Sequence, residues 1–138
     1  MTTRPSRGYQ EVPHTADWAL RVWAEDLPSL FVEAAIGMDV LTGRELEPEP
    51  RLSRSLELEA GDEESLLVAF LSELLYLQEQ QDLGFDTYRI EIKGSRLRAK
   101  MEGAPLRSVA KPIKAVTFHN LHIAHTRSGC EVELVFDV

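Results

Sequence analysis

The sequence predicts an α+β fold in which mostly antiparallel β-sheets pack against two main helices. Two observations indicate this class. Two segments repeat apolar residues at the three- and four-residue spacing of a helix, and most of the other segments alternate apolar and polar residues as strands do. At 138 residues, with 43% hydrophobic content, the chain is expected to form one domain, 1–138, with a flexible stretch at 1–8.

The N-terminal part predicts two strands joined by a tight turn. The segment "YQEV" ends at Pro13, and "WALRVWA" at Trp18–Ala24 alternates like a strand. Residues 14–17, "HTAD", form the expected turn between them.

Both predicted helices carry signals for their ends. Their apolar residues recur over 27–41 and over 66–77, and the second helix has a wide apolar face that suggests packing against a sheet. Aspartates can cap the starts and glycines can close the ends. The caps are Asp26 and Asp62, and the expected closing residues are Gly43 and Gly84.

The remaining segments predict a loop and five strands. "ELEPEPR" reads as a loop because Pro48 and Pro50 prevent regular pairing, and "LSRSLELEA" after it as a strand. "DTYRIEIKGSRLRAKMEG" predicts a hairpin turning at Gly94-Ser95, followed by an ambiguous loop over Gly103–Lys111. "AVTFHNLHIAH" and "EVELVFDV" complete the expected order ββαβαββββ.

Composition favours a cytoplasmic protein without a membrane span. No long apolar stretch is present, the N-terminus lacks the apolar core of a secretion signal, and the single cysteine, Cys130, fits a reducing compartment. The net charge of −8 argues against a general nucleic-acid coat protein. Residues 92–138 nevertheless carry 8 basic and 4 acidic groups, a polarity that can steer a partner.

The end of the sequence brings acidic groups together. Read as a strand, it places Val132, Leu134, Phe136 and Val138 on one face, so an apolar stripe runs to the last residue. Asp137 and the terminal carboxylate then end one strand, while Asp17 precedes another. If these ends meet, their oxygens would repel one another unless a divalent cation lay between them, with calcium, magnesium or manganese favoured over zinc.

Other chemical motifs are weak. No glycine-rich phosphate loop, nucleophile elbow or zinc pair of cysteines is present. His119, His122 and His125 are spaced by three, but in a strand His119 and His125 share one face and His122 takes the other, which argues against a zinc site.

Several segments together resemble the archease family, from about Val12 to Val138. They are "HTADWALRVWA", "LPSLFVEAAIGM", "LLVAFLSELLYL", "IKAVTFHNLHI" and the terminal "VFDV". The resemblance implies a compact α+β sandwich that serves as a protein cofactor of an RtcB-type RNA ligase in tRNA splicing and RNA repair. Such a cofactor helps the ligase to load GMP and to turn over repeatedly, and it meets RNA and guanine nucleotide only through the ligase.

The resemblance also implies site residues. Carried over by motif, Asp17, Asp137 and the terminal oxygens of Val138 would hold a divalent cation, most readily calcium, and Lys114 would be the lysine of the Lys-Ala-Val-Thr motif. Many relatives carry an acidic residue and a histidine ahead of that motif, whereas this chain has neither between Gly103 and Lys114. No catalytic residue of its own is expected.

Two other functions stay open at this stage. A metal-dependent hydrolase could use Asp17 and Asp137, with His14 or His119 as the base. A chaperone-like module would need an exposed apolar stripe, and none is evident because the leucine-rich helix is more simply core.

Overall fold

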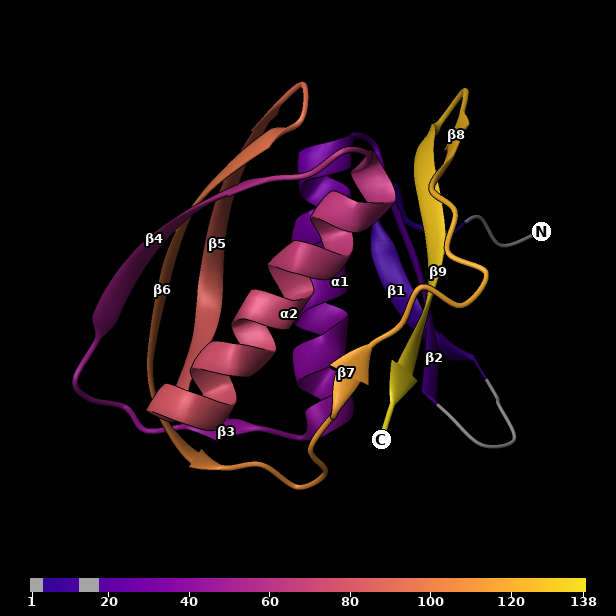
Figure 1. The fold of residues 1–138 in the computed structure, drawn as a ribbon. Coiled ribbons are helices and arrows are strands. Elements are labelled where there is room, and N and C mark those ends of the chain that lie inside the picture. The colour runs from indigo at the N-terminus through magenta and orange to yellow at the C-terminus, as the bar shows by residue number, and fades with distance from the viewer. Residues whose placement is uncertain (1–3, 13–17) are drawn as a thin grey trace.

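The computed structural model describes residues 4–12 and 18–138, which form two helices between two β-sheets (Figure 1). One sheet has the order β1-β2-β9-β7, with β8 also paired to β9. The other has the order β3-β6-β4, with β5 also paired to β6. All pairings are antiparallel, so the predicted α+β class is confirmed.

The element bounds follow the chain in order. They are β1 Gly8–Val12, β2 Trp18–Ala24, α1 Leu27–Thr42, β3 Glu45–Leu46, β4 Leu52–Glu59, α2 Glu63–Gln81, β5 Leu83–Lys93, β6 Arg96–Ser108, β7 Ala115–Val116, β8 Ala124–Thr126 and β9 Gly129–Asp137.

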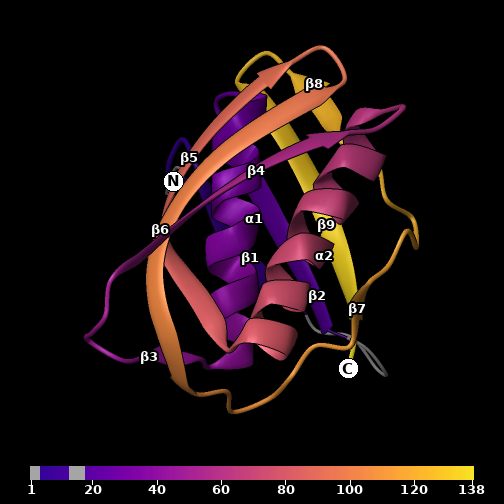
Figure 2. The same ribbon diagram turned by 60° about the vertical axis from the view of Figure 1, so that its left-hand side comes forward.

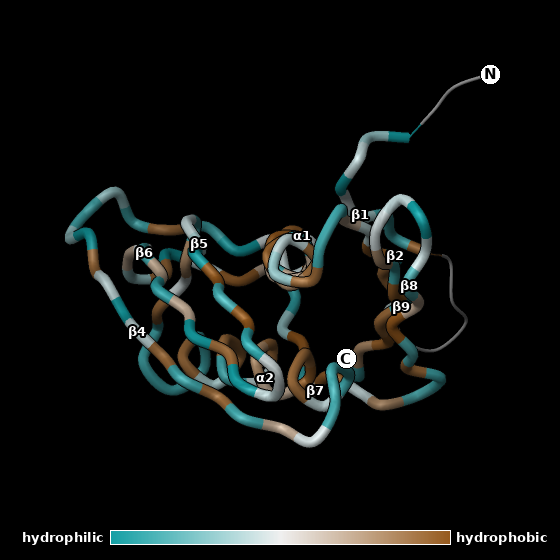
Figure 3. The backbone as a smooth tube through the Cα atoms, turned by 90° about the horizontal axis from the view of Figure 1, so that it is seen from above, coloured by the Kyte–Doolittle hydropathy of each residue, from teal (hydrophilic) through white to brown (hydrophobic). Residues whose placement is uncertain are grey.

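The helices form where the apolar spacing predicted them. Asp26 caps α1 by accepting a hydrogen bond from the Ser29 N–H, and Asp62 does the same for α2 through Ser65. Seen from above, both helices lie between the sheets (Figure 3). Phe31 and Phe70 stack with ring centroids 5.9 Å apart, which joins the two helices at the centre of the core.

The end of α2 differs from the prediction. The helix ends at Gln81, and Asp82 rather than Gly84 takes the left-handed conformation that closes it, with a φ of 52°. Gly84 belongs to β5, where a Cβ would lie 2.6 Å from Leu46 Cδ2. The glycine is therefore required for close packing and not for capping.

Three segments predicted as loop or continuous strand are organised otherwise. Glu45–Leu46, assigned to a loop, pairs with β6 as the short strand β3. The expected loop from Gly103 is strand as far as Ser108, because β6 continues beside both β5 and β3. The segment Ala115–His125 is not one strand: it is interrupted after Val116 and paired again only from Ala124.

Candidate functional site

The last strand, β9, is held on both sides. β2 pairs along it from Cys130 to Phe136, while β8 and β7 cover successive parts of its other edge. Val132, Leu134 and Phe136 are buried, as the alternating pattern predicted. Because β7 pairs Val116 with Phe136 and Ala115 with Asp137, the order of the sheet extends to the last strand residue.

Asp137 and Val138 lie at the surface end of this strand. The Asp137 side chain is exposed and Val138 is half-buried. The Lys114 N–H donates a hydrogen bond of 2.8 Å to the Asp137 carbonyl oxygen, so the exposed Lys114 is fixed beside the two residues. Figures 1 and 2 show the C-terminus and β7 at the same end of the molecule.

Asp17, the third predicted cation ligand, lies outside the described residues. Its chain neighbour Trp18 pairs with Phe136, the residue before Asp137. Among residues 4–12 and 18–138, no cluster of three His, Cys, Asp or Glu side chains is placed to hold a metal ion. The carboxylates of Asp137 and Val138 are hard oxygen donors of the kind that calcium and magnesium prefer, so their chemistry fits the expected cation.

The segment leading into β7 is fixed at three points. The Lys111 N–H donates to the Thr42 carbonyl oxygen over 3.0 Å, the Ile113 side chain is buried in the core, and the Lys114 N–H bonds Asp137. In addition, the Lys111 Nζ lies 4.1 Å from the centroid of the Trp18 ring. Sequence reasoning did not single out Lys111, because its contact with Trp18 joins distant parts of the chain.

The histidines do not share a strand. His119 lies in a turn after β7, where Asn120 has a positive φ of 51°, and its N–H donates to Thr117 Oγ1. His125 is on β8, and its Nε2 lies 2.7 Å from Glu63 Oε2. The prediction that His119 and His125 occupy one strand face was therefore wrong, because only His125 lies in a strand.

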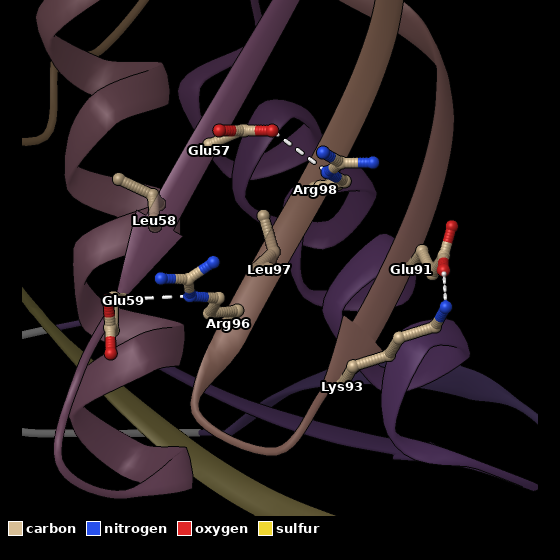
Figure 4. A pocket seen from close by; sticks show the side chains of 8 residues that line it. All are labelled: Glu57, Leu58, Glu59, Glu91, Lys93, Arg96, Leu97 and Arg98. Carbon is tan, nitrogen blue, oxygen red and sulfur yellow. Dashed lines mark hydrogen bonds and ion pairs between the residues drawn. The ribbon is translucent and has the colours of Figure 1, made fainter.

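A pocket of about 510 Å³ lies over the β5–β6 hairpin and the neighbouring strand β4 (Figure 4). Its charged side chains are paired across or along the strands. Arg98 Nε lies 2.8 Å from Glu57 Oε1, Arg96 Nε 3.6 Å from Glu59 Oε2, and Lys93 Nζ 3.0 Å from Glu91 Oε1. Since these partners neutralise one another, we do not assign a ligand to this pocket.

A buried polar network connects the end of α1 to β5. Arg44 Nη2 lies 3.0 Å from Asp39 Oδ2, and the Tyr88 hydroxyl lies 2.7 Å from the same oxygen. Arg44 Nη2 also bonds the Phe85 carbonyl. Burial raises the pKa of the Asp39 carboxyl, against the opposing charge and hydrogen bond of Arg44. Burial and the charge of Asp39 raise the pKa of the Tyr88 hydroxyl, which therefore remains a donor. This network is a structural brace.

The single cysteine is not an activated nucleophile. Cys130 is buried where β9 begins, and burial raises the pKa of its thiol to about 11. Only the thiolate is strongly nucleophilic, so this side chain is unreactive at neutral pH.

No helix of the described residues is both long and apolar enough to cross a membrane. The described chain is an α+β sandwich whose candidate site is a charged edge, at which Lys114 flanks the end of the last strand.

Comparison with known proteins names the family. Residues 9–138 match the family described as Archease protein family (MTH1598/TM1083). The chain therefore belongs to the archease family, and the resemblance inferred from its motifs is confirmed.

Individual relatives agree. Protein archease of Thermococcus gammatolerans is 33% identical over 131 residues, covering 89% of this chain and 92% of the relative. Protein archease of Methanopyrus kandleri is 33% identical over 140 residues, covering 94% and 99%.

Two solved structures share the fold. The solution structure of Methanobacterium thermoautotrophicum protein 1598 gives a TM-score of 0.69 at 23% identity, covering 95% of this chain and 99% of that chain. The crystal structure of Thermotoga maritima TM1083 is described as an archease and possible chaperone. It gives a TM-score of 0.70 at 21% sequence identity, and the match covers 100% of this chain and 98% of that chain.

Proposed function

We propose that this protein activates an RtcB-type RNA ligase in the cytoplasm, promoting transfer of GMP to the ligase and repeated turnover in tRNA splicing and RNA repair. RNA and guanine nucleotide meet the protein only through the ligase. The observation that carries the proposal is the placement of Lys114 beside Asp137 and Val138 at the held end of β9, in a chain that belongs to the archease family.

The charged edge would act on the ligase and not on RNA directly. Lys114 presents an ammonium group as a compact point charge that can meet a phosphate or an acidic ligase residue. Its main chain is already bonded to Asp137, so little order has to be created on docking. Asp17, Asp137 and the terminal carboxylate of Val138 are the proposed ligands of a divalent cation. When bound, calcium, or magnesium or manganese in its place, supplies positive charge between these carboxylates.

The two competing functions have less support. A hydrolase needs a positioned base, and His119 is exposed in a turn, while His14 lies outside the described residues. The exposed large apolar side chains of the described part belong to different elements, Val40 to α1, Tyr76 to α2 and Phe118 to the β7–β8 connection. They do not make the continuous stripe that a chaperone surface requires.

The purified protein alone is expected neither to ligate nor to cleave RNA, since the described part of its charged edge offers no base and nucleophile in mutual contact. The measurement is incubation with RNA ends carrying a 2′,3′-cyclic phosphate and a 5′-hydroxyl, followed by gel analysis. Ligated product that persists after rigorous removal of ligase would refute this expectation.

Lys114→Ala is expected to lower activation of the ligase by about tenfold, the effect of losing one charge-assisted contact. The fold should be retained, with a stability change within about 0.5 kcal/mol, because the side chain is exposed and alanine keeps the N–H that bonds Asp137. Activation is measured as multiple-turnover ligation at limiting protein. Unchanged activation would argue against the role, and a large fall in Tm would make the lysine structural.

The test of the function itself is multiple-turnover ligation by the cognate ligase, with and without this protein. The proposal expects many products per ligase only when the protein is added. Equal turnover under both conditions would contradict it.

A further inference from the structure

Lys111 is held at the same edge as Lys114. The first lysine is fixed through its N–H to Thr42 and the second through its N–H to Asp137, while Ile113 between them is anchored in the core. Trp18, over which the Lys111 ammonium lies, pairs with Phe136 at the end of β9. Lys111 and Lys114 therefore flank the end of the last strand from a short, immobilised segment.

The contact with Trp18 orients the Lys111 ammonium without neutralising it. An exposed cation over an indole ring is stabilised by about 0.5–1 kcal/mol, and it keeps N–H donors directed away from the ring. No carboxylate among the described residues forms an ion pair with Lys111. The lysine is exposed, so these donors are accessible to an incoming anion.

Charge supports an anionic ligand at the two lysines. This is an acidic protein, with a net charge of −8, yet its segment 111–114 has no acidic residue and places two lysines at the edge that also carries Asp137 and the carboxylate of Val138. An ammonium group binds phosphate as a point charge, and two of them on a rigid segment lower the conformational entropy lost on binding.

We propose that Lys111, positioned by Trp18, acts with Lys114 as an anion-binding edge that receives a phosphate group of the guanine nucleotide bound to the ligase. The identity of this nucleotide rests on the proposed function, whereas the phosphate affinity of the edge does not. Lys111 is thus a second contact residue for activation, and Trp18 is its positioning residue.

The ligase-free test is an NMR titration of the protein with sodium pyrophosphate in the presence of magnesium. Pyrophosphate is expected to shift the Trp18 indole and Lys111 amide resonances in the native protein. Lys111→Gln should remove this response and Lys111→Arg should restore it. Lys100→Gln is the matched control, because Lys100 is an exposed lysine on β6 of the other sheet, and it should respond like the native protein.

The second arm measures binding to the cognate ligase with and without GMP loaded on it. Lys111→Gln should weaken binding to the GMP-loaded ligase by about fivefold, the upper range for an exposed charge pair, and binding to the unloaded ligase much less. Trp18→Phe, which keeps a weaker ring contact, should give an intermediate loss, with its fold checked by thermal melt.

The outcomes separate the two proposals. The proposed anion-binding edge would be wrong if pyrophosphate shifted no resonances in the native protein, or shifted them equally in Lys111→Gln. This holds even if the protein activates the ligase. If Lys111→Gln weakens binding to the GMP-loaded and the unloaded ligase equally, the anion-binding edge does not receive the nucleotide phosphate. A normal pyrophosphate response together with absent ligase activation would instead leave the edge standing and overturn the proposed function.

Discussion

Arg44→Met is expected to lower the free energy of unfolding by about 3 kcal/mol, because it leaves a buried carboxylate without its cation. The side chains of Arg44 and Asp39 are only 12% and 13% exposed. Methionine preserves much of the packing of the arginine stem but can make neither the Asp39 contact nor the bond to the Phe85 carbonyl. The measurement is urea unfolding of the native and variant proteins.

The pH dependence of this loss has a definite sign. Burial already raises the pKa of the Asp39 carboxyl, and Arg44 opposes that rise, so removing Arg44 raises the pKa further. A carboxyl whose pKa is higher in the folded state stabilises the fold when it is protonated. The deficit of Arg44→Met should therefore be larger near pH 8 than near pH 5.

Two controls test the cause. Arg54→Met removes an exposed arginine of β4 whose hydrogen bond reaches only the neighbouring Ser53 carbonyl, and it should change stability little. The double variant Asp39→Leu/Arg44→Met removes both charges and should recover part of the loss. Two results would contradict a structural role of this network. One is an Arg44→Met variant as stable as the native protein, and the other is a double variant that loses more stability than its two single changes added together.

Asp137→Asn is expected to abolish most of the stabilisation that calcium would confer at the proposed cation site. An ion that binds only the folded state stabilises it by about 2.7 kcal/mol at a hundredfold excess over its Kd, and an amide oxygen is a weaker ligand than a carboxylate. Asp17→Asn should have the same effect, and so should residues added after Val138, since the carboxylate then becomes an amide. Thermal melts with and without calcium, magnesium or manganese measure the shift.

Glu133→Gln is the matched control for this site. Glu133 is an exposed carboxylate on the same strand, and its Oε1 lies 3.3 Å from Arg21 Nη2. Its variant should keep the full calcium shift. A native protein without any metal-dependent shift, or a C-terminally extended form that keeps all of it, would end the idea of a shared cation site.

Much of the fold could be predicted because its signals are local. Asp26 and Asp62 cap the helices as expected, and Gly43 ends α1 in the left-handed conformation with a φ of 61°. The alternation in β9 correctly separated buried from exposed residues along most of the strand, whereas β2 is buried on both faces except at Arg21.

The errors arose where tertiary contacts decide the local structure. Gly84 looked like a helix end, yet the approach of Leu46 is what requires a glycine there. The segment Ala115–His125 alternates as a strand should, but Asn120 turns the chain, and the Leu121 N–H bonds the Phe118 carbonyl. Periodicity could not reveal that β7 and β8 pair with separate parts of β9.

The candidate site was predicted only in part, because some of its features have local signals in the sequence and others depend on distant residues. An apolar stripe reaching Val138 indicated that the end of β9 is held, and the structure confirms this for Asp137 through β7. Lys111 could not be found in this way, because its position depends on Thr42 and Trp18, which lie far away in the sequence. The cation itself stays a prediction.

The most direct measurement of the central claim is the rate at which labelled GMP becomes covalently bound to the cognate ligase. The account predicts that the native protein accelerates this reaction, that Lys100→Gln matches it, and that Lys114→Ala and Asp137→Asn accelerate it far less. A rate of GMP transfer that is the same with and without the native protein would contradict the account.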